Sequence, residues 1–129
     1  MRIVLQKVSD ARVVKNDLFN EINHGYLLLV GVSEDSTSED ARKLAEKIAK
    51  SRNFEDREGK INLSINDVEG EILSISQFTL YADTKKGNRP SFTRAAKSEK
   101  ALALYKEFNE VLSSYGLTVK EGFFGEHMN

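Results

Sequence analysis

The 129-residue sequence predicts an α/β fold, a three-layer sandwich in which two mostly antiparallel β layers are covered by a layer of two α-helices. Strand-like segments outnumber helical segments, and only two segments have the periodicity of an amphipathic helix. In addition, the strand predicted over residues 71–82 is apolar on both faces, as expected for a strand between two other layers. No repeat, low-complexity segment or linker interrupts the chain, so a single domain is predicted over residues 1–129.

Five segments have the β-branched and aromatic composition of strands and are bounded by turn-forming residues. In chain order they are 2–8 (RIVLQKV), 11–14 (ARVV), 25–32 (GYLLLVGV), 71–82 (EILSISQFTLYA) and 117–124 (LTVKEGFF). Residues 15–22 contain a hairpin turn predicted at Asn16 and Asp17, and residues 54–71 are turn-rich. Because residues 25–32 are apolar without alternation, we expect this strand to be covered on both faces.

Two helices are predicted from apolar residues that repeat at i, i+3, i+4 and i+7. The first helix follows a capping box formed by Ser36 and Glu39. Its apolar face consists of Ala41, Leu44, Ala45, Ile48 and Ala49. The second helix is predicted over residues 98–116 and ends at Gly116. Its apolar face consists of Ala101, Leu104, Tyr105, Phe108, Leu112 and Tyr115.

The composition is that of a globular protein with little net charge. The net charge is −1, and hydrophobic and charged residues make up 40% and 30% of the chain. The absence of cysteine excludes disulfides, thiolate metal sites and cysteine nucleophiles. The longest apolar run, residues 26–32, is far shorter than the roughly 20 residues of a membrane span. We therefore expect a cytoplasmic protein that does not contact membranes.

The strand predicted over residues 71–82 carries polar residues where a core strand would be aliphatic. Since side chains alternate between faces, one face carries Leu73, Ile75, Gln77, Thr79 and Tyr81, and the other carries Ile72, Ser74, Ser76, Phe78 and Leu80. Gln77 and Thr79 are then neighbours on a largely enclosed face, where an unpaired polar group costs about 1–3 kcal/mol. They either form hydrogen bonds with a neighbouring turn or line a small polar pocket at the end of the strand.

A basic segment follows this strand. Between residues 83 and 100 there are six positive and two negative side chains, a local charge of +4. The positive residues are Lys85, Lys86, Arg89, Arg94, Lys97 and Lys100. Such a segment is either a solvated charged stretch or a surface that binds phosphates.

Common catalytic motifs are absent from the sequence. There is no GxSxG, HExxH or GxxxxGK[ST] motif. Of the two histidines, His24 precedes a glycine in a predicted turn and His127 lies near the last residue, so neither is near Thr79 in sequence. The sequence therefore offers no obvious base to activate a threonine nucleophile.

Several segments together resemble one known family. They are RIVLQKVSDARV (2–13), FEDREGKINLS (54–64), SQFTLYADTKKGNRPSF (76–92) and GFFGEHM (122–128). The chain is similar to the D-aminoacyl-tRNA deacylase family from Met1 to Asn129, and the SQFTL run with the RPSF turn is a specific signature. The resemblance implies a cytoplasmic homodimer that acts without a cofactor or metal. It would hydrolyse the ester of D-aminoacyl-tRNA, and of mischarged glycyl-tRNA, as chiral proofreading in translation quality control.

The resemblance also assigns site residues. Gln77 and Thr79 would be catalytic, and the pocket for the terminal adenosine and the ester would include Ser76, Phe78, Phe124 and Met128. Binding of tRNA phosphates is expected from Lys85, Lys86 and Arg89. In the mechanism that the family implies, the terminal ribose 2′-hydroxyl helps to activate water, and Thr79 is not the nucleophile. An aminoacyl ester is already activated, so positioning and oxyanion hydrogen bonds could suffice.

Two departures from the family pattern affect the expected selectivity. The family usually continues with one more strand and an N-x-G-P-x-T motif, whose cis Gly-Pro peptide enters the partner subunit's pocket and excludes L-amino acids. The sequence ends at Asn129 and its only proline is Pro90, so the single deacylase domain 1–129 is expected to lack this strand, either because the sequence is truncated or because the chirality filter is missing. In addition, Lys7 stands where many relatives carry arginine, and lysine cannot form the same forked pair of hydrogen bonds.

Two other classes of function are compatible with the residues. A non-catalytic RNA-binding module would use the basic turn at 83–100 and the nearby Phe92. A dimeric structural protein would contain the same polar strand within its core. Deacylation assays with D-Tyr-tRNA and L-Tyr-tRNA separate the enzyme from the module, because the module would bind tRNA without turnover.

Overall fold

The computed structural model describes residues 1–15, 18–77 and 98–122. Its elements are β1 (Arg2–Val8), β2 (Ala11–Lys15), β3 (Leu18–Ile22), β4 (Gly25–Gly31), α1 (Ser38–Lys50), β5 (Arg52–Glu55), β6 (Ile61–Ser64), β7 (Glu71–Ser76), α2 (Ser98–Ser114) and β8 (Thr118–Glu121). The predicted α/β class and the layer of two helices are confirmed. The turn expected at Asn16 and Asp17 lies outside the described residues.

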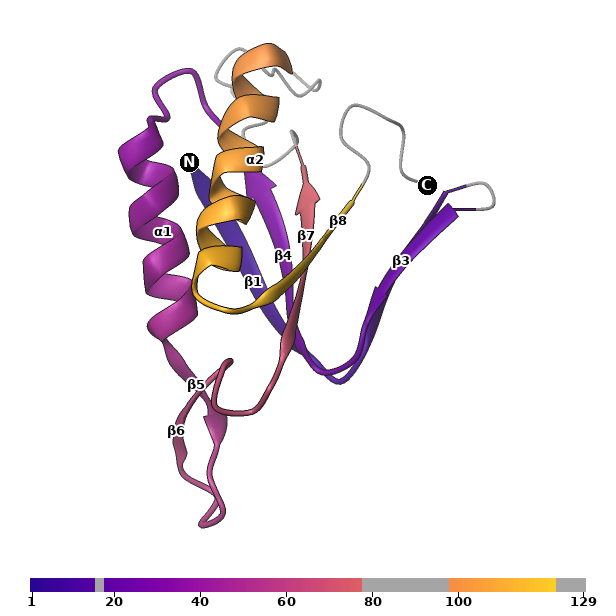
Figure 1. Cartoon of the computed structure of the whole chain (residues 1–129), viewed down its shortest axis with the longest axis vertical. Coiled ribbons are helices and arrows are strands. Elements are labelled where there is room, and N and C mark those ends of the chain that lie inside the picture. The colour runs from indigo at the N-terminus through magenta and orange to yellow at the C-terminus, as the bar shows by residue number, and fades with distance from the viewer. Residues whose placement is uncertain (16–17, 78–97, 123–129) are drawn as a thin grey trace, which may run out of the picture.

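The central sheet has the strand order β1-β4-β7-β8. Only β1 and β4 are antiparallel, whereas β4, β7 and β8 run parallel to one another. The prediction of mostly antiparallel layers is therefore wrong for this sheet. Between successive parallel strands the chain returns through α1 or α2, and such a crossover brings each strand in at the same end of the sheet. Both helices consequently lie on one face of the sheet (Figure 1).

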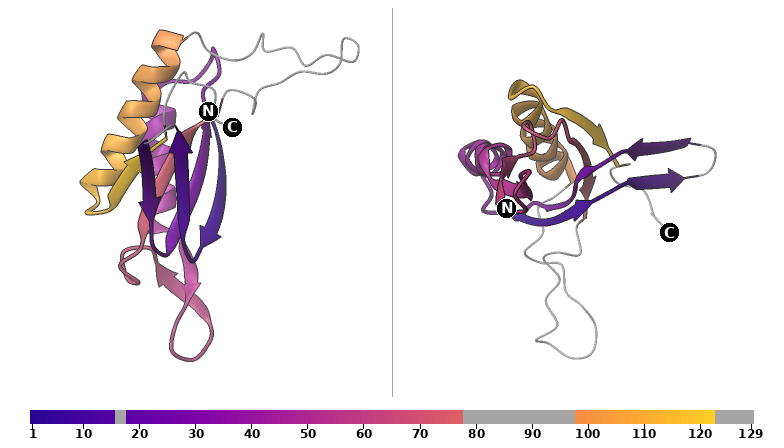
Figure 2. Two further views of the ribbon diagram at one scale, coloured as in Figure 1. Left: turned by 90° about the vertical axis from the view of Figure 1, so that its right-hand side faces the viewer. Right: turned by 90° about the horizontal axis from the view of Figure 1, so that it is seen from below.

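The second β layer is the antiparallel ribbon of β2 and β3. Figure 2 shows this ribbon on the side of the sheet opposite the helices. A small core lies between the two layers, formed by buried Ile22, Leu73 and Ile75. Two side-chain bonds tie β3 to β8: Asn20 Nδ2 donates to the carbonyl oxygen of Glu121 at 2.5 Å, and Lys120 Nζ donates to that of Glu21 at 2.7 Å.

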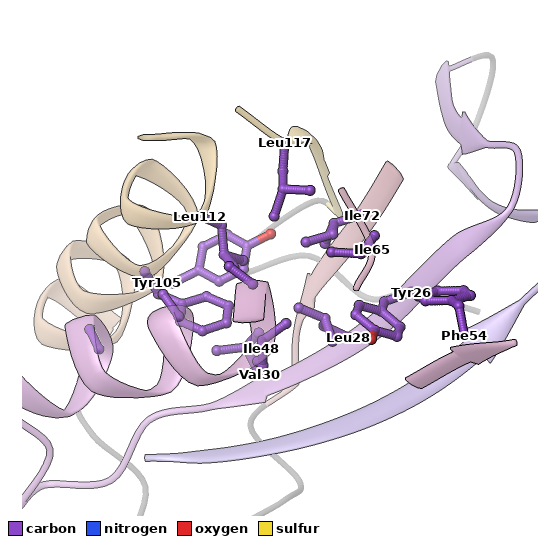
Figure 3. Close-up of a cluster of buried hydrophobic side chains, with 14 residues drawn as sticks. Tyr26, Leu28, Val30, Ile48, Phe54, Ile65, Ile72, Tyr105, Leu112 and Leu117 are labelled. Carbon is purple, nitrogen blue, oxygen red and sulfur yellow. The ribbon is translucent and has the colours of Figure 1, made fainter. Parts of the chain in front are cut away.

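The main core lies between the sheet and the two helices (Figure 3). From the helices it contains Ala41, Ala45, Ile48, Ala49, Tyr105, Phe108 and Leu112, which confirms the predicted apolar faces. From the sheet it contains Tyr26, Leu28, Val30 and Ile72. The central strands β4 and β7 are thus apolar because both of their faces are covered, as the sequence predicted.

Helix α1 begins one residue later than the predicted capping box. Thr37 is the N-cap: its Oγ1 accepts from the backbone nitrogen of Asp40 at 3.2 Å, and the Asp40 carboxylate accepts from the backbone nitrogen of Thr37 at 3.0 Å. The prediction of Ser36 and Glu39 is wrong because the Ser36 hydroxyl is used elsewhere. It accepts from the backbone nitrogen of Ser33 at 2.9 Å and so closes the turn after β4.

The segment predicted as turn-rich, residues 54–71, contains part of an antiparallel hairpin. Strands β5 and β6 pair across a turn in which Gly59 has a φ of +78°, a conformation that favours glycine. The hairpin projects beyond the end of the sheet (Figure 1). Throughout residues 1–15, 18–77 and 98–122, no helix has both the length and the apolar character needed to cross a bilayer.

Candidate functional site

The carboxyl ends of the parallel strands β4, β7 and β8 lie at one edge of the sheet. The first turns of α1 and α2 lie at the same end of the molecule (Figure 1). We call this end the carboxyl edge. In open α/β sheets, ligands bind outside the carboxyl ends of the strands, and the N-terminal ends of helices favour negative charge. The carboxyl edge is thus where a fold of this class is expected to bind a ligand.

Two of the predicted site residues, Ser76 and Gln77, lie at the carboxyl edge. Ser76 is the last residue of β7, and Gln77 follows it; both are half-buried. The backbone nitrogen of Gln77 donates to the carbonyl oxygen of Val30 at 2.8 Å, so β4 still holds the chain one residue beyond the end of β7. Ser76 pairs with Val30, whose side chain lies in the helix-side core, and Gln77 therefore faces the ribbon side.

The other predicted site residues lie outside the described residues. They are Phe78, Thr79, Lys85, Lys86, Arg89, Phe124 and Met128. The last described residue before Phe124 is Gly122, whose backbone nitrogen donates to the carbonyl oxygen of Ser74 at 2.7 Å. The two described ends from which these segments continue, Gln77 and Gly122, are therefore both fixed at the carboxyl edge.

A buried polar contact beneath this edge was not predicted. The hydroxyl of Tyr105 donates to the carbonyl oxygen of Ser74 at 2.6 Å. Burial raises the pKa of Tyr105 to about 12. The sequence indicated only that Tyr105 belongs to the apolar face of the second helix, since its spacing carries no information about a hydroxyl partner in another element.

Near this contact, the carboxylate of Glu121 joins β8 to α2 on the side that faces solvent. Glu121 Oε2 accepts from Asn109 Nδ2 at 2.7 Å, and Glu121 Oε1 lies 2.7 Å from Lys106 Nζ. Both donors belong to α2, whereas Glu121 is the last residue of β8. Within the described residues, the buried Ser74 hydroxyl and the side-chain oxygen of Asn109 have no hydrogen-bond partner.

A second contact closes the carboxyl edge from the other side. Lys100, in the first turn of α2, donates from its Nζ to the carbonyl oxygen of Glu34. Glu34 lies in the turn between β4 and α1 that the Ser33 and Ser36 hydroxyls close at 3.0 Å. The start of α2 is therefore anchored beside the end of β4.

Among the described residues, two hollows that are open to solvent lie at the opposite end of the sheet. A hollow of about 250 Å³ is lined by Asn20, Glu21, Ile22, Asn23, Glu71 and Lys120, and one of about 560 Å³ by Asn23, His24, Asn66, Glu69, Gly70, Glu71, Gly116 and Thr118. His24 Nε2 lies 2.6 Å from the carbonyl oxygen of Val68, so this ring stabilises a turn. In the part of the chain that the structure describes, no three His, Asp or Glu side chains are grouped to hold a metal ion.

Lys7 also lies away from the carboxyl edge of its own chain. It pairs with Tyr26 at the start of β4, whereas Gln77 follows the end of β7 beside Val30. Lys7 Nζ donates to the carbonyl oxygen of Asn53 at 3.0 Å and lies 5.5 Å from the centre of the Phe54 ring. In this chain Lys7 therefore holds β5 against β1.

The chain is similar to known proteins in sequence and in fold. A D-aminoacyl-tRNA deacylase of Staphylococcus epidermidis is 56% identical over 129 residues, which are 100% of this chain and 86% of that protein. One from Staphylococcus aureus is 54% identical over the same shares. The solved structure of c-Myc DNA Unwinding Element Binding Protein superposes with a TM-score of 0.89 at 36% identity, covering 100% of this chain and 89% of that chain.

A second solved structure, of a probable eukaryotic D-amino acid tRNA deacylase, has a TM-score of 0.83. It is 18% identical and covers 98% of this chain and 90% of that chain, so it supports the fold alone. By name, the two bacterial relatives are enzymes that remove an acyl group from tRNA, and the class of protein is therefore that of the aminoacyl-tRNA deacylases. Residues 4–129 match the family model described as D-Tyr-tRNA(Tyr) deacylase, and the chain belongs to that family.

Proposed function

We propose that this chain hydrolyses the ester bond of D-aminoacyl-tRNA and releases a free D-amino acid and tRNA. The observation that carries the proposal is the match of residues 4–129 to the deacylase family, together with bacterial deacylases that are more than 50% identical over the whole chain. The chain is thus an ester hydrolase with aminoacyl-tRNA as its substrate. The biological role that follows is chiral proofreading in translation quality control.

In this proposal the catalytic residues are Gln77, which lies at the carboxyl edge, and Thr79, two residues further along the sequence. An aminoacyl ester is activated toward hydrolysis, so groups that orient the ester and stabilise the developing oxyanion supply much of the catalysis. A side-chain amide such as that of Gln77 is a suitable donor for this purpose. Ser76, Phe78, Phe124 and Met128 would complete the pocket. The fixed backbone of Gln77 supports this proposal, because a donor must be held in place before the reaction begins.

The tRNA-binding part of the proposal concerns Lys85, Lys86 and Arg89. These residues follow the strand that ends at the carboxyl edge and belong to the segment with a local charge of +4. Lysine and arginine bind nucleic acids mainly through phosphates. A basic segment that follows the catalytic residues in the sequence would hold the acceptor end of tRNA while the ester enters the pocket.

The finer parts of the proposal are a homodimer, a cytoplasmic location and activity on mischarged glycyl-tRNA. An exposed edge supports the dimer: β1 is the first strand of the sheet, and Val4 and Leu5 are 44% and 37% exposed. Apolar edge strands favour pairing with another chain. Glycine has no side chain, so an obstacle that rejects L side chains does not exclude it. The absence of cysteine is compatible with the reducing cytoplasm.

The proposal is tested by incubating the purified chain with D-Tyr-tRNA, L-Tyr-tRNA and glycyl-tRNA and measuring the release of each amino acid. We expect release from D-Tyr-tRNA well above the uncatalysed rate. Binding of tRNA without release would contradict the enzymatic function and favour the RNA-binding module. Sedimentation of the same sample tests the dimer separately. A monomeric chain would contradict the dimer without affecting the result for deacylase activity.

A further inference from the structure

A single carbonyl oxygen, that of Ser74, joins three elements beneath the carboxyl edge. It accepts from the backbone nitrogen of Gly122 at 2.7 Å and from the hydroxyl of Tyr105 at 2.6 Å. Ser74 belongs to β7 and lies two residues before Ser76, while Gly122 directly follows β8. The two bonds thus fix the distance between the strand ends from which both parts of the proposed pocket continue.

The hydroxyl of Tyr105 is well suited to hold this junction. Tyr105 and Ser74 are both fully buried, with exposed fractions of 0%, so water does not compete for the bond. Burial raises the pKa of Tyr105 to about 12, and the hydroxyl therefore stays protonated and able to donate at every pH used for assays. The Tyr105 ring lies within the main core (Figure 3), which leaves the hydroxyl little freedom to move.

The same helix also holds β8. Lys106 and Asn109 bind the carboxylate of Glu121, the residue before Gly122. Helix α2 therefore contacts β7 through the hydroxyl of its own Tyr105, and it contacts β8 at the Glu121 carboxylate. A change in either contact alters the position of the strand ends without touching the proposed catalytic side chains.

We propose that Tyr105 is a positioning residue for the deacylation reaction, acting by fixing the end of β7 relative to the end of β8. This inference rests on the proposed function, because it takes the carboxyl edge as the reaction centre. Its physical basis is that a displacement of about 1 Å in a catalytic group can cost about 10²-fold in rate. Because the binding of tRNA phosphates is proposed to rest on Lys85, Lys86 and Arg89 and not on Tyr105, we expect the effect in kcat more than in KM.

The chain offers a matched control in Tyr26. Tyr26 is also fully buried in the main core, and its hydroxyl accepts from Asn53 Nδ2 at 2.9 Å. It lies at the other end of β4, away from Gln77. Tyr26→Phe and Tyr105→Phe therefore remove the same atom from the same core, and only Tyr105→Phe removes it beneath the carboxyl edge.

The experiment compares kcat and KM for D-Tyr-tRNA in the wild-type chain, Tyr105→Phe and Tyr26→Phe. We expect Tyr105→Phe to lower kcat by about 10-fold to 100-fold while KM changes by less than about twofold. Tyr26→Phe should leave both parameters within about twofold of the wild type, whatever it does to stability. Equal kcat values for the wild type and folded Tyr105→Phe would overturn the inference and leave the deacylase function intact.

A second variant keeps the test decisive if Tyr105→Phe does not fold. Glu121→Gln places an amide NH₂ against one of the two donors from α2 and so loosens the same junction from its exposed side. It should lower kcat by about threefold or more, and an unchanged kcat in this variant would overturn the inference. A wild-type chain without deacylase activity would overturn the proposed function, and the inference with it.

Discussion

The backbone nitrogen of Gln77 lies 2.8 Å from the carbonyl oxygen of Val30 and donates a hydrogen bond to it. The bond uses only main-chain atoms, so a substitution of the Gln77 side chain leaves it intact. Variants at this position therefore report on the chemistry of the side chain while the strand end stays in place.

Replacement of Gln77 by alanine is expected to remove an oxyanion donor. The loss of one such donor typically costs about 10²–10³ in rate, so kcat for D-Tyr-tRNA should fall by that factor. Asn62→Ala is the matched control, because Asn62 carries an exposed side-chain amide on β6, in the hairpin beyond the opposite end of the sheet. A Gln77→Ala variant as active as Asn62→Ala would show that Gln77 has no catalytic role.

Neutralisation of the basic segment is expected to weaken tRNA binding. If Lys85, Lys86 and Arg89 each contact a phosphate, changing all three to glutamine should reduce the slope of log affinity against log salt by about two to three. The unfolding midpoint should not change. The matched control changes Lys43, Lys47 and Lys50 of the exposed face of α1. An equal loss of slope in the control would mean that binding is not localised at the basic segment.

Removal of the N-cap of α1 is expected to destabilise the fold. Thr37→Ala deletes the oxygen that accepts from the backbone nitrogen of Asp40 and should lower the free energy of unfolding by about 1 kcal/mol. Thr37→Ser retains this oxygen and should lie close to the wild type in urea unfolding. If Thr37→Ala is as stable as Thr37→Ser, the capping box does not contribute to stability.

The stability of the chain should depend on the ionisation of Tyr105 at high pH. Burial raises the pKa of Tyr105 from 10 to about 12, so the unfolded chain loses this proton before the folded chain does. The stabilisation is therefore fully present below pH 10 and is lost as the pH rises through 12. Between these limits the free energy of unfolding should fall by about 2 kcal/mol more in the wild type than in Tyr105→Phe. Parallel stability curves from pH 9 to 11.5 would contradict this.

The periodicity of apolar residues predicted the helices and the central strands correctly. The unbroken apolar run of β4, the two helix faces and the two-sided burial of β7 follow from side-chain periodicity, and each is confirmed. The cap of α1 was misassigned because Ser36 and Thr37 are both good N-caps, and the choice depends on the bond between Ser36 and Ser33.

The same patterns do not predict contacts between segments that are far apart in the sequence. The parallel pairing of β4, β7 and β8 depends on how the crossovers pack, and no strand sequence records that. The Tyr105 hydroxyl finds its partner 31 residues away, through the fold and not through spacing. The resemblance supplied the roles of Thr79, Phe124 and Met128, which remain predictions. For Gln77 the structure adds a main-chain bond to Val30, a contact that the sequence did not indicate.

The junction at the Ser74 carbonyl also sets an order of events during synthesis. Its donors, Tyr105 and Gly122, emerge from the ribosome after β7 is complete. Until then β7 has β4 beside it in the sheet and β3 against its ribbon-side face, and the helix-side face of Ile72 is not covered by α2. Pairing between segments far apart in the chain slows folding, and apolar strands left uncovered are where incomplete chains aggregate. We therefore expect the carboxyl edge to be among the last parts of the molecule to form.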